Sequence, residues 1–327
     1  MTHKERFMAA ISFRQPSDMV AMFELAFQIY GEYIGEDPVV GCDFANLSPK
    51  EKERALHRNA EIMIEAAQKA GHDAILDFGA YWEVAPGVPA LLWLPTFEDR
   101  LAQMRAVRDA AGGEFALAGV LGGMIGTIPL AGGDVYGLIE RIYDDPEGVH
   151  TEAESILQGM LAMQREMRET GADAIINCTD IAFNTGTFFS PRQLEEFFFP
   201  YLARWAKACK EEGLLSILHT DGNLHGVMDQ ILASGINALQ CVDPLAGMDI
   251  GSLKKEVDGK LALIGNVDCS VLHTGTPEEI DGLCKEVLES CKHGGGFAFG
   301  GCNAIFKGIS AESYQIMVDA RKKYGSY

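Results

Sequence analysis

The chain has 327 residues, of which 47% are hydrophobic and 23% charged, a composition typical of a globular protein with one sizeable core. Its formal net charge of −20 argues against nucleic acid as a partner, because nucleic-acid binding needs a basic surface. No apolar run approaches the ~20 residues of a membrane-spanning helix. No apolar signal core follows the first residues, so we expect a cytoplasmic protein with no membrane attachment and free thiols.

Short β-like runs alternate with amphipathic helical stretches along the whole chain. After a first helix at 4–12, three helix starts place a hydroxyl residue before a proline, with an acid or amide two residues after the proline: Ser48-Pro49, Ser190-Pro191 and Thr276-Pro277. The predicted strands are Met19–Phe23, Ala74–Phe78, Phe115–Val120, Ala174–Cys178, Leu215–His219, Ala238–Val242, Leu261–Gly265 and Phe297–Gly300. The other predicted helices lie near 48–70, 133–143, 191–212, 223–234, 247–257, 277–292 and 310–324.

Eight strands alternating with helices, without a flexible linker, predict a single-domain (β/α)₈ barrel of the TIM type over residues 1–327. A doubly wound open sheet is the alternative, but no glycine fingerprint follows the first strand. The helix at 4–12 would cap the bottom of the barrel or lie beside it. The stretches 24–48 and 79–113 are predicted to be long loops over the mouth at the C-terminal ends of the strands.

Residues that follow the predicted strands suggest a metal site, because barrel chemistry lies at the C-terminal strand ends. His219 ends the fifth strand and Cys302 follows the eighth, among acids and thiols with few cations nearby. Such a ring suits a bound cation better than a phosphate. A catalytic zinc takes three protein ligands and keeps one position open. The candidates to complete a set with His219 and Cys302 are Asp221, Asp180, Glu83 and Cys241.

Each of these residues also has a structural interpretation. His219 could be a hydrogen-bonded core histidine, and Cys302 a small buried residue, as we interpret Cys178 and Cys241 within or beside apolar strands. Asp221 could simply close a turn before the glycine that follows it. An aromatic group ahead of the helix at 191–212 suits either an apolar pocket or a homodimer face: Phe183, Phe188 and Phe189.

Several motifs together resemble the uroporphyrinogen decarboxylase family over nearly the whole length of the chain. The resemblance implies a (β/α)₈ barrel, in agreement with the independent strand pattern. It also implies one of two activities, because the family contains decarboxylases and corrinoid-dependent methyltransferases. The motifs are Glu5–Ile11 followed by Pro16-Ser17-Asp18, Asp180 with Thr185-Gly186 and Ser190-Pro191, ILHTDGN at 217–223, LIGNVD at 263–268 and GGFAFGGCNAI at 295–305.

The decarboxylase branch grips the many carboxylates of its porphyrinogen with a basic N-terminal segment. In this chain the corresponding residues 20–28 contain no arginine and include Glu24, which would repel such a substrate. A metal-independent decarboxylase (a carboxy-lyase) is therefore the alternative function. Its substrate would be a porphyrinogen-like or smaller carboxylic acid, and Asp180 or Asp221 would hold pyrrole-like nitrogens.

The methyltransferase branch binds zinc through a His-x-Cys pair after the fifth strand and a second cysteine near the end of the chain. The resemblance matches at His219 and Cys302, whereas Asp221 stands where the branch has cysteine. A carboxylate is a harder ligand than a thiolate and would leave the metal more electrophilic. Glu83, in a segment that resembles the branch's acidic stretch, is a candidate fourth ligand. Cys269 replaces a proline of the family, a difference that the sequence does not explain.

The resemblance thus implies a zinc-dependent methyltransferase with a corrinoid protein as its partner. It would move a methyl group between cobalt and a thiol, or between cobalt and a methylated or methoxylated small molecule. His219 and Cys302 would anchor Zn²⁺ and Asp221 or Glu83 would complete the site. Asp180 would position the reacting group or move a proton. A corrinoid carrier without turnover is the non-enzyme hypothesis, but the chain lacks the Asp-x-His-x-x-Gly motif of such carriers.

Overall fold

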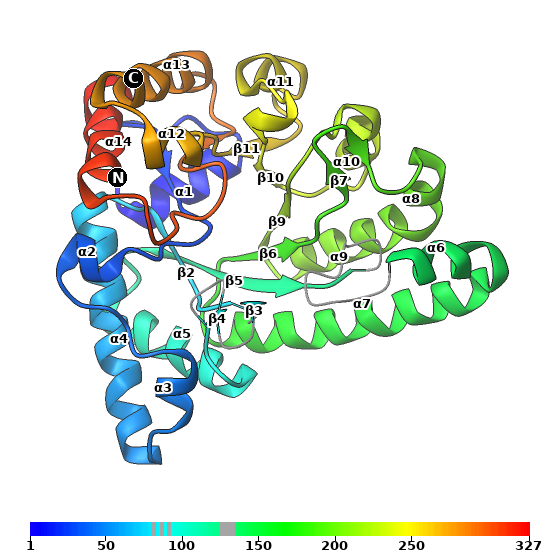
Figure 1. Cartoon of the computed structure of the whole chain (residues 1–327), viewed down its shortest axis with the longest axis horizontal. Helices are drawn as coiled ribbons and strands as arrows, with labels where there is room; N and C mark the ends of the chain where they lie inside the picture. The colour runs from blue at the N-terminus through cyan, green and yellow to red at the C-terminus, as the bar shows by residue number, and fades with distance from the viewer. Residues whose placement is uncertain (80–82, 86–87, 90–92, 125–134) are drawn as a thin grey trace.

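The computed structural model describes all residues except 80–82, 86–87, 90–92 and 125–134. Eight parallel strands form one sheet that curls into a nearly closed barrel, with β1 and β2 at its two edges (Figure 1). This architecture confirms the predicted (β/α)₈ barrel. The strands are β1 (Ala21–Met22), β2 (Ala74–Leu76), β5 (Ala116–Gly122), β6 (Ala174–Cys178), β9 (Leu215–Thr220), β10 (Ala238–Cys241), β11 (Ala262–Ile264) and β12 (Phe297–Phe299).

Helices follow the strands around the barrel, and two short antiparallel hairpins and two 3₁₀ turns complete the described elements. The hairpins pair β3 (Glu83–Ala85) with β4 (Val88–Pro89) and β7 (Ala182–Phe183) with β8 (Gly186–Thr187). The helices are α1 (His3–Ile11), α2 (Tyr30–Ile34), α3 (Gly41–Ala45), α4 (Pro49–Ala70), α5 (Phe97–Ala111), α6 (Val135–Asp144), α7 (Pro146–Glu169), α8 (Pro191–Phe197), α9 (Phe199–Glu211), α10 (Met228–Ala233), α11 (Ile250–Glu256), α12 (Cys269–Thr274), α13 (Pro277–Cys291) and α14 (Ala311–Tyr324). The 3₁₀ turns are η1 (His225–Val227) and η2 (Pro244–Ala246).

The three predicted helix starts are confirmed by their capping hydrogen bonds. Ser48, Ser190 and Thr276 each make a capping box with the acid or amide at the third helical position. The single helix predicted at 191–212 is two helices, which meet at Phe198. Pro200 explains the break, because it has no N–H for the preceding helical turn and its ring crowds that turn.

Two long helices, α5 and α7, and three short ones, α2, α3 and α12, were not predicted. Helix α5 lies within the stretch 79–113 that was expected to form loops, and α7 had no counterpart among the predicted helices. Both have N-cap residues that mark their starts. The Thr96 hydroxyl accepts the N–H of Asp99, and Asp145 precedes a proline at the start of α7. In Figure 1 the long α7 runs along the outside of the barrel beside α9.

The interior of the barrel is filled from below by α1. Its residues Phe7, Ala10 and Ile11 are buried and join a cluster of mostly small strand residues. Backbone hydrogen bonds tie the helix to the starts of strands, from Lys4 N–H to the Glu114 carbonyl (2.9 Å) and from Gly296 N–H to the Ala10 carbonyl (2.9 Å). The helix therefore caps the bottom, one of its two expected positions, and leaves the C-terminal ends of the strands as the open end.

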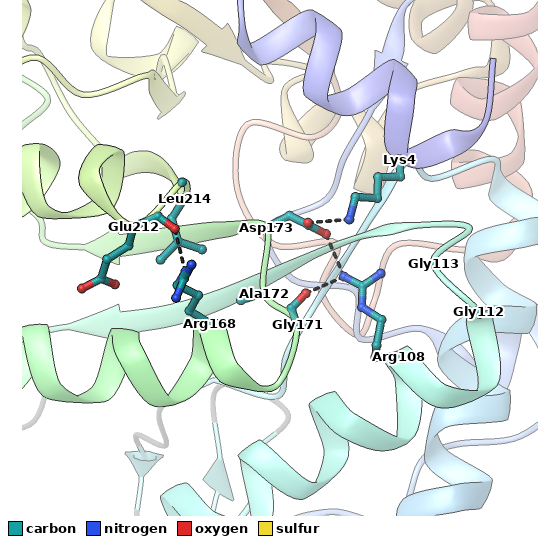
Figure 2. Close-up of a pocket in the computed structure, with 11 residues that line it drawn as sticks. Lys4, Arg108, Gly112, Gly113, Arg168, Gly171, Ala172, Asp173, Glu212 and Leu214 are labelled. Carbon is teal, nitrogen blue, oxygen red and sulfur yellow. Dashed lines mark hydrogen bonds and ion pairs between the residues drawn. The ribbon is translucent and has the colours of Figure 1, made fainter.

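A cavity of about 800 Å³ on the bottom rim lies among the ends of α5, α7 and α9 (Figure 2). Its cations are already paired within the fold. Lys4 and Arg108 both bind the Asp173 carboxylate, at 2.6 and 2.8 Å. Arg168 donates to the Glu212 carbonyl at 2.6 Å, and Arg108 also donates to a loop carbonyl. These contacts neutralise helix C-termini, so we assign the cavity a structural role.

The seam between β1 and β2 is closed by Asp73, which precedes β2. Its backbone N–H donates to the Met22 carbonyl and its carboxylate accepts the Met22 N–H, both at 2.8 Å. The same carboxylate binds Arg6 from α1 at 2.5 Å and Arg321 from α14 at 2.8 Å. Helices from both ends of the chain thus meet at one buried acid.

Candidate metal and substrate site

His219 lies at the open end of the barrel, where β9 ends, and its ring is buried. The pairing of β9 with β10 sets Gln240 opposite it, and His219 Nδ1 is hydrogen-bonded to Gln240 Oε1. Gln240 Nε2 donates to the Cys302 carbonyl at 3.2 Å. Because the amide nitrogen faces a carbonyl, Oε1 must accept, and Nδ1 must carry the proton. The Nε2 lone pair of His219 is then available, which is the tautomer of a metal ligand.

Two carboxylates face that nitrogen. His219 Nε2 lies 3.9 Å from Asp180 Oδ1 and 3.8 Å from Asp221 Oδ1. One donor atom from each residue lies within 4.8 Å of the other two. Asp221 is held in place by its own N–H, which donates to Asp180 Oδ1 at 3.2 Å, and by Asn303 Nδ2, which donates to Oδ2 at 2.8 Å. The structure thus brings together three of the predicted site residues.

The donor group fits a divalent metal. Asp221 Oδ1 is buried and accepts no hydrogen bond from a nitrogen or hydroxyl of any described residue, and the donor near this carboxylate is the thiol of Cys241, which is a weak one. A buried carboxylate oxygen with so weak a donor is costly unless a cation satisfies it. Imidazole nitrogen with carboxylate oxygens is a donor set that zinc accepts. Burial, with the charge of Asp221 adding to it, raises the pKa of Asp180, although the neighbouring His219 opposes this.

Three thiols lie beside this group. Cys302 Sγ is 3.8 Å from Cys269 Sγ, and the thiol of Cys241 is hydrogen-bonded to Cys302 and to the Asp221 carboxylate. The contacts of Cys302 with the other two thiols lower its pKa below the ordinary value, and the same contacts, together with burial, raise the pKa of Cys241 and of Cys269. Cys302 does not belong to the compact three-donor group. Its connection to His219 runs through Gln240, and its role as a ligand stays a prediction.

The backbone around Cys241 is strained. Cys241 and Val242 have φ angles of 106° and 51°, in the left-handed region that only glycine adopts easily. Asn266 holds this turn, since its Nδ2 donates to the Val242 carbonyl at 2.8 Å. The strain supports a functional interpretation of Cys241 over the small buried residue expected from the sequence. Cys178 is half-buried, and burial raises its pKa, in line with an inert thiol.

A cavity of about 400 Å³ opens beside Asp180 and Asp221. Its apolar wall is the β7–β8 hairpin, where the rings of Phe183 and Phe188 meet edge to face with centroids 4.2 Å apart. Phe183 is 56% exposed, which is unusual for so large an apolar side chain and marks a surface suited to a ligand. The cavity volume is in the range of small-molecule sites.

The turn after His219 is shaped to receive this hairpin. Gly222 has a φ of +91°, and a Cβ there would lie 2.7 Å from the Ala182 carbonyl. The Asn223 N–H donates to the Phe183 carbonyl at 2.8 Å. The Gly-Asn pair after Asp221 therefore fastens the aromatic wall directly to the metal-ligand turn.

The other acids at the strand ends have different roles. Asp77 is buried and pairs with Arg100. Glu24 is buried, where it accepts the Gly301 N–H at 2.9 Å and the Tyr314 hydroxyl at 3.1 Å, and burial raises its pKa to about 8. Glu83 begins β3, but its side chain lies outside the described residues, so its role stays a prediction.

The barrel and the donor group at its open end define a (β/α)₈ protein whose chemistry lies at the C-terminal strand ends. Residues 94–324 match the family described as "Uroporphyrinogen decarboxylase (URO-D)", and the chain belongs to that family. The expected family is thereby confirmed. Within the described part of the chain, no helix has the length and apolarity needed to cross a membrane.

The chain is similar to members of both functional branches. It is 30% identical over 212 residues to "Methylcobamide:CoM methyltransferase MtbA" of Methanosarcina mazei, a match that covers 63% of this chain and 58% of that protein. It is 24% identical over 232 residues to "Uroporphyrinogen decarboxylase" of Pseudoalteromonas atlantica, covering 68% and 63%. The chain thus matches less than two thirds of the length of these relatives. A solved "methyltransferase from Methanosarcina mazei" has the same fold, with a TM-score of 0.76, 16% identity and 99% of both chains covered.

Proposed function

We propose that the protein is a zinc-dependent methyltransferase that moves a methyl group between the cobalt of a corrinoid protein and a small molecule. That molecule is a thiol or a methylated or methoxylated compound. The observation that carries the proposal is the group of His219 Nε2 with the carboxylates of Asp180 and Asp221, in which a buried oxygen of Asp221 has only the weak thiol donor of Cys241 nearby. The similarity to a methylcobamide methyltransferase supports methyl transfer as the proposed reaction.

In this proposal His219, Asp221 and Cys302 hold the metal, with Glu83 as a further ligand. Bound zinc would lower the pKa of a thiol or polarise the heteroatom that carries the methyl group. Gln240 fixes the imidazole so that Nε2 faces the site. Asp180, with its raised pKa, is suited to exchange a proton with the reacting heteroatom.

The small molecule would enter the cavity against Phe183 and Phe188. The hairpin that carries these rings is fastened to the Asp221 turn, so a methyl group held on the apolar wall lies near the proposed metal ligands. The same wall would exclude water from the bound small molecule during methyl transfer.

Metal-independent decarboxylation is the less favoured function. The described residues that line the cavity include Asp180 and Asp221 but no lysine or arginine, so a substrate with several carboxylates would be repelled. Glu24 accepts from the Gly301 N–H and the Tyr314 hydroxyl within the fold, so it takes no part in this cavity.

Metal analysis joined to a transfer assay tests the proposal. Protein purified without chelator is expected to contain zinc, and the His219→Ala variant to lose it. His225→Ala, an exposed histidine on the same side of the barrel, is the matched control and should keep its zinc. Methyl transfer is followed by cobalamin absorbance, from methylcobalamin to a thiol and from a methoxylated aromatic to reduced cobalamin. Wild-type protein without zinc, or His219→Ala with full zinc, would refute the metal assignment.

A further inference from the structure

Cys269 and Cys302 are held side by side by the backbone. Cys269 begins α12 just after β11, and Cys302 follows β12. Val267 and Gly301 form a parallel bridge, and the Cys302 N–H donates to the Val267 carbonyl at 2.8 Å. This pairing places the two thiols next to each other, and both side chains are buried.

The sulfur atoms are close enough for a covalent bond to form without a change of fold. Cys269 Sγ and Cys302 Sγ are 3.8 Å apart, whereas a disulfide needs about 2.05 Å. Rotation of the two side chains on a backbone that is already paired can supply the difference. Cys241 is the competing partner, since its thiol also contacts Cys302, but it is the strained last residue of β10.

We propose that Cys269 and Cys302 form a redox pair, which a hydroperoxide oxidises to a disulfide that removes Cys302 from the metal site. Formation of the disulfide does not depend on the methyltransferase proposal. Only its effect on zinc binding rests on the proposed function. It also gives a role to Cys269, the residue that the sequence left unexplained.

The chemistry has two balanced steps. The Cys302 thiolate attacks one peroxide oxygen and the O–O bond breaks, which gives a sulfenic acid on Cys302 and releases hydroxide or an alkoxide that takes a proton from water. The Cys269 thiol then attacks the Cys302 sulfur, the S–O bond breaks, and water leaves as the S–S bond forms. The peroxide gains two electrons, one from each sulfur. Reduction by an external thiol or dithiol restores both cysteines.

The disulfide would change the metal site without unfolding it. His219 and Asp221 keep their hydrogen bonds to Gln240 and Asn303, which do not involve the Cys302 sulfur. A metal that uses Cys302 as a ligand loses that ligand and binds more weakly. Conversely, zinc bound to Cys302 occupies the nucleophilic sulfur and should slow the oxidation.

Peptide mapping after peroxide treatment tests the proposal. The reduced, zinc-free protein is exposed to hydrogen peroxide, alkylated and digested. The expected result is one cross-linked species that joins the Cys269 and Cys302 peptides, reversed by dithiothreitol and at least fivefold slower to form in zinc-loaded protein. A cross-link from Cys302 to Cys241, or oxidation of Cys302 only to sulfinic acid, would overturn the proposal. Equal rates with and without zinc would overturn its link to the metal site.

Two single variants separate the pair from its neighbours. Cys269→Ala and Cys241→Ala each remove one thiol partner of Cys302, and only Cys269→Ala should abolish the cross-link. Cys269→Ala should retain zinc, because the proposal gives Cys269 no ligand role; loss of zinc as complete as in His219→Ala would overturn it. A protein that forms the cross-link but binds no zinc would refute the proposed function while leaving the redox pair intact.

Discussion

Replacement of Gln240 by leucine should weaken zinc binding without removing a ligand. Gln240 accepts from His219 Nδ1 and donates to the Cys302 carbonyl, so it orients one proposed ligand and the backbone of another. Loss of such an orienting contact typically costs 10- to 100-fold in metal affinity, or about 1.4–2.7 kcal/mol. Leucine would also leave a buried N–H and a buried carbonyl without partners, at about 1–3 kcal/mol each in folding stability.

Gln240→Glu is the matched control, because it keeps an acceptor for His219 Nδ1–H while it removes the donor to the Cys302 carbonyl and adds a negative charge beside the imidazole. Zinc affinity is measured by competition with a chromophoric chelator, and folding by urea denaturation of the zinc-free variants. We expect Gln240→Leu to lose most affinity and Gln240→Glu to lose less. A folded Gln240→Leu protein with wild-type zinc affinity would refute the inferred histidine tautomer.

Three further predictions concern buried acids and the aromatic wall. Because burial raises the pKa of Glu24 from 4.5 to about 8, the folded state holds a proton that the unfolded state releases. The contribution of Glu24 to the unfolding free energy should therefore fall as pH rises across that window, by at most ~1.4 kcal/mol per pH unit. Urea titrations of the wild type and of Glu24→Gln across this pH range should differ by that contribution. Arg100→Met should leave Asp77 as an uncompensated buried acid and destabilise the fold by ~3–5 kcal/mol, measured by the same titrations; a change below 1 kcal/mol would contradict it. Phe183→Ala should barely change stability but weaken binding of guaiacol by about five- to tenfold in calorimetry, and unchanged affinity would exclude this wall from the site.

The barrel was predictable because its signals are local. The hydroxyl-proline helix starts at Ser48, Ser190 and Thr276 depend on residues within one helical turn, and each strand ends in a short apolar run. His219 could be identified for the same reason, as an imidazole at the end of such a run. Helix α7 carries comparable signals, an N-cap acid and apolar residues at helical spacing, so its position too is encoded locally in the sequence.

The contacts of the site could not be predicted in the same way. Gln240 faces His219 only through the register of β9 against β10. Asn303 reaches Asp221 across 82 positions of sequence, and Cys269 reaches Cys302 across 33. Such pairs depend on how far each strand extends toward the open end of the barrel, and on the direction of the side chains in the loops that follow the strands. Neither property follows from periodicity, which is why Cys269 had no interpretation until its neighbour was known.

The partners of Asp73, the buried acid between β1 and β2, are synthesised at very different times. Asp73 joins β1 to β2, but its carboxylate is held from opposite sides by Arg6 near the start of the chain and by Arg321 in α14. The first two strands are made early, yet the charge between them stays without one of its two arginines until nearly the whole chain has emerged. Until β12 pairs with β1 the sheet keeps an unpaired edge, and an unpaired edge is where association with another chain is most favoured.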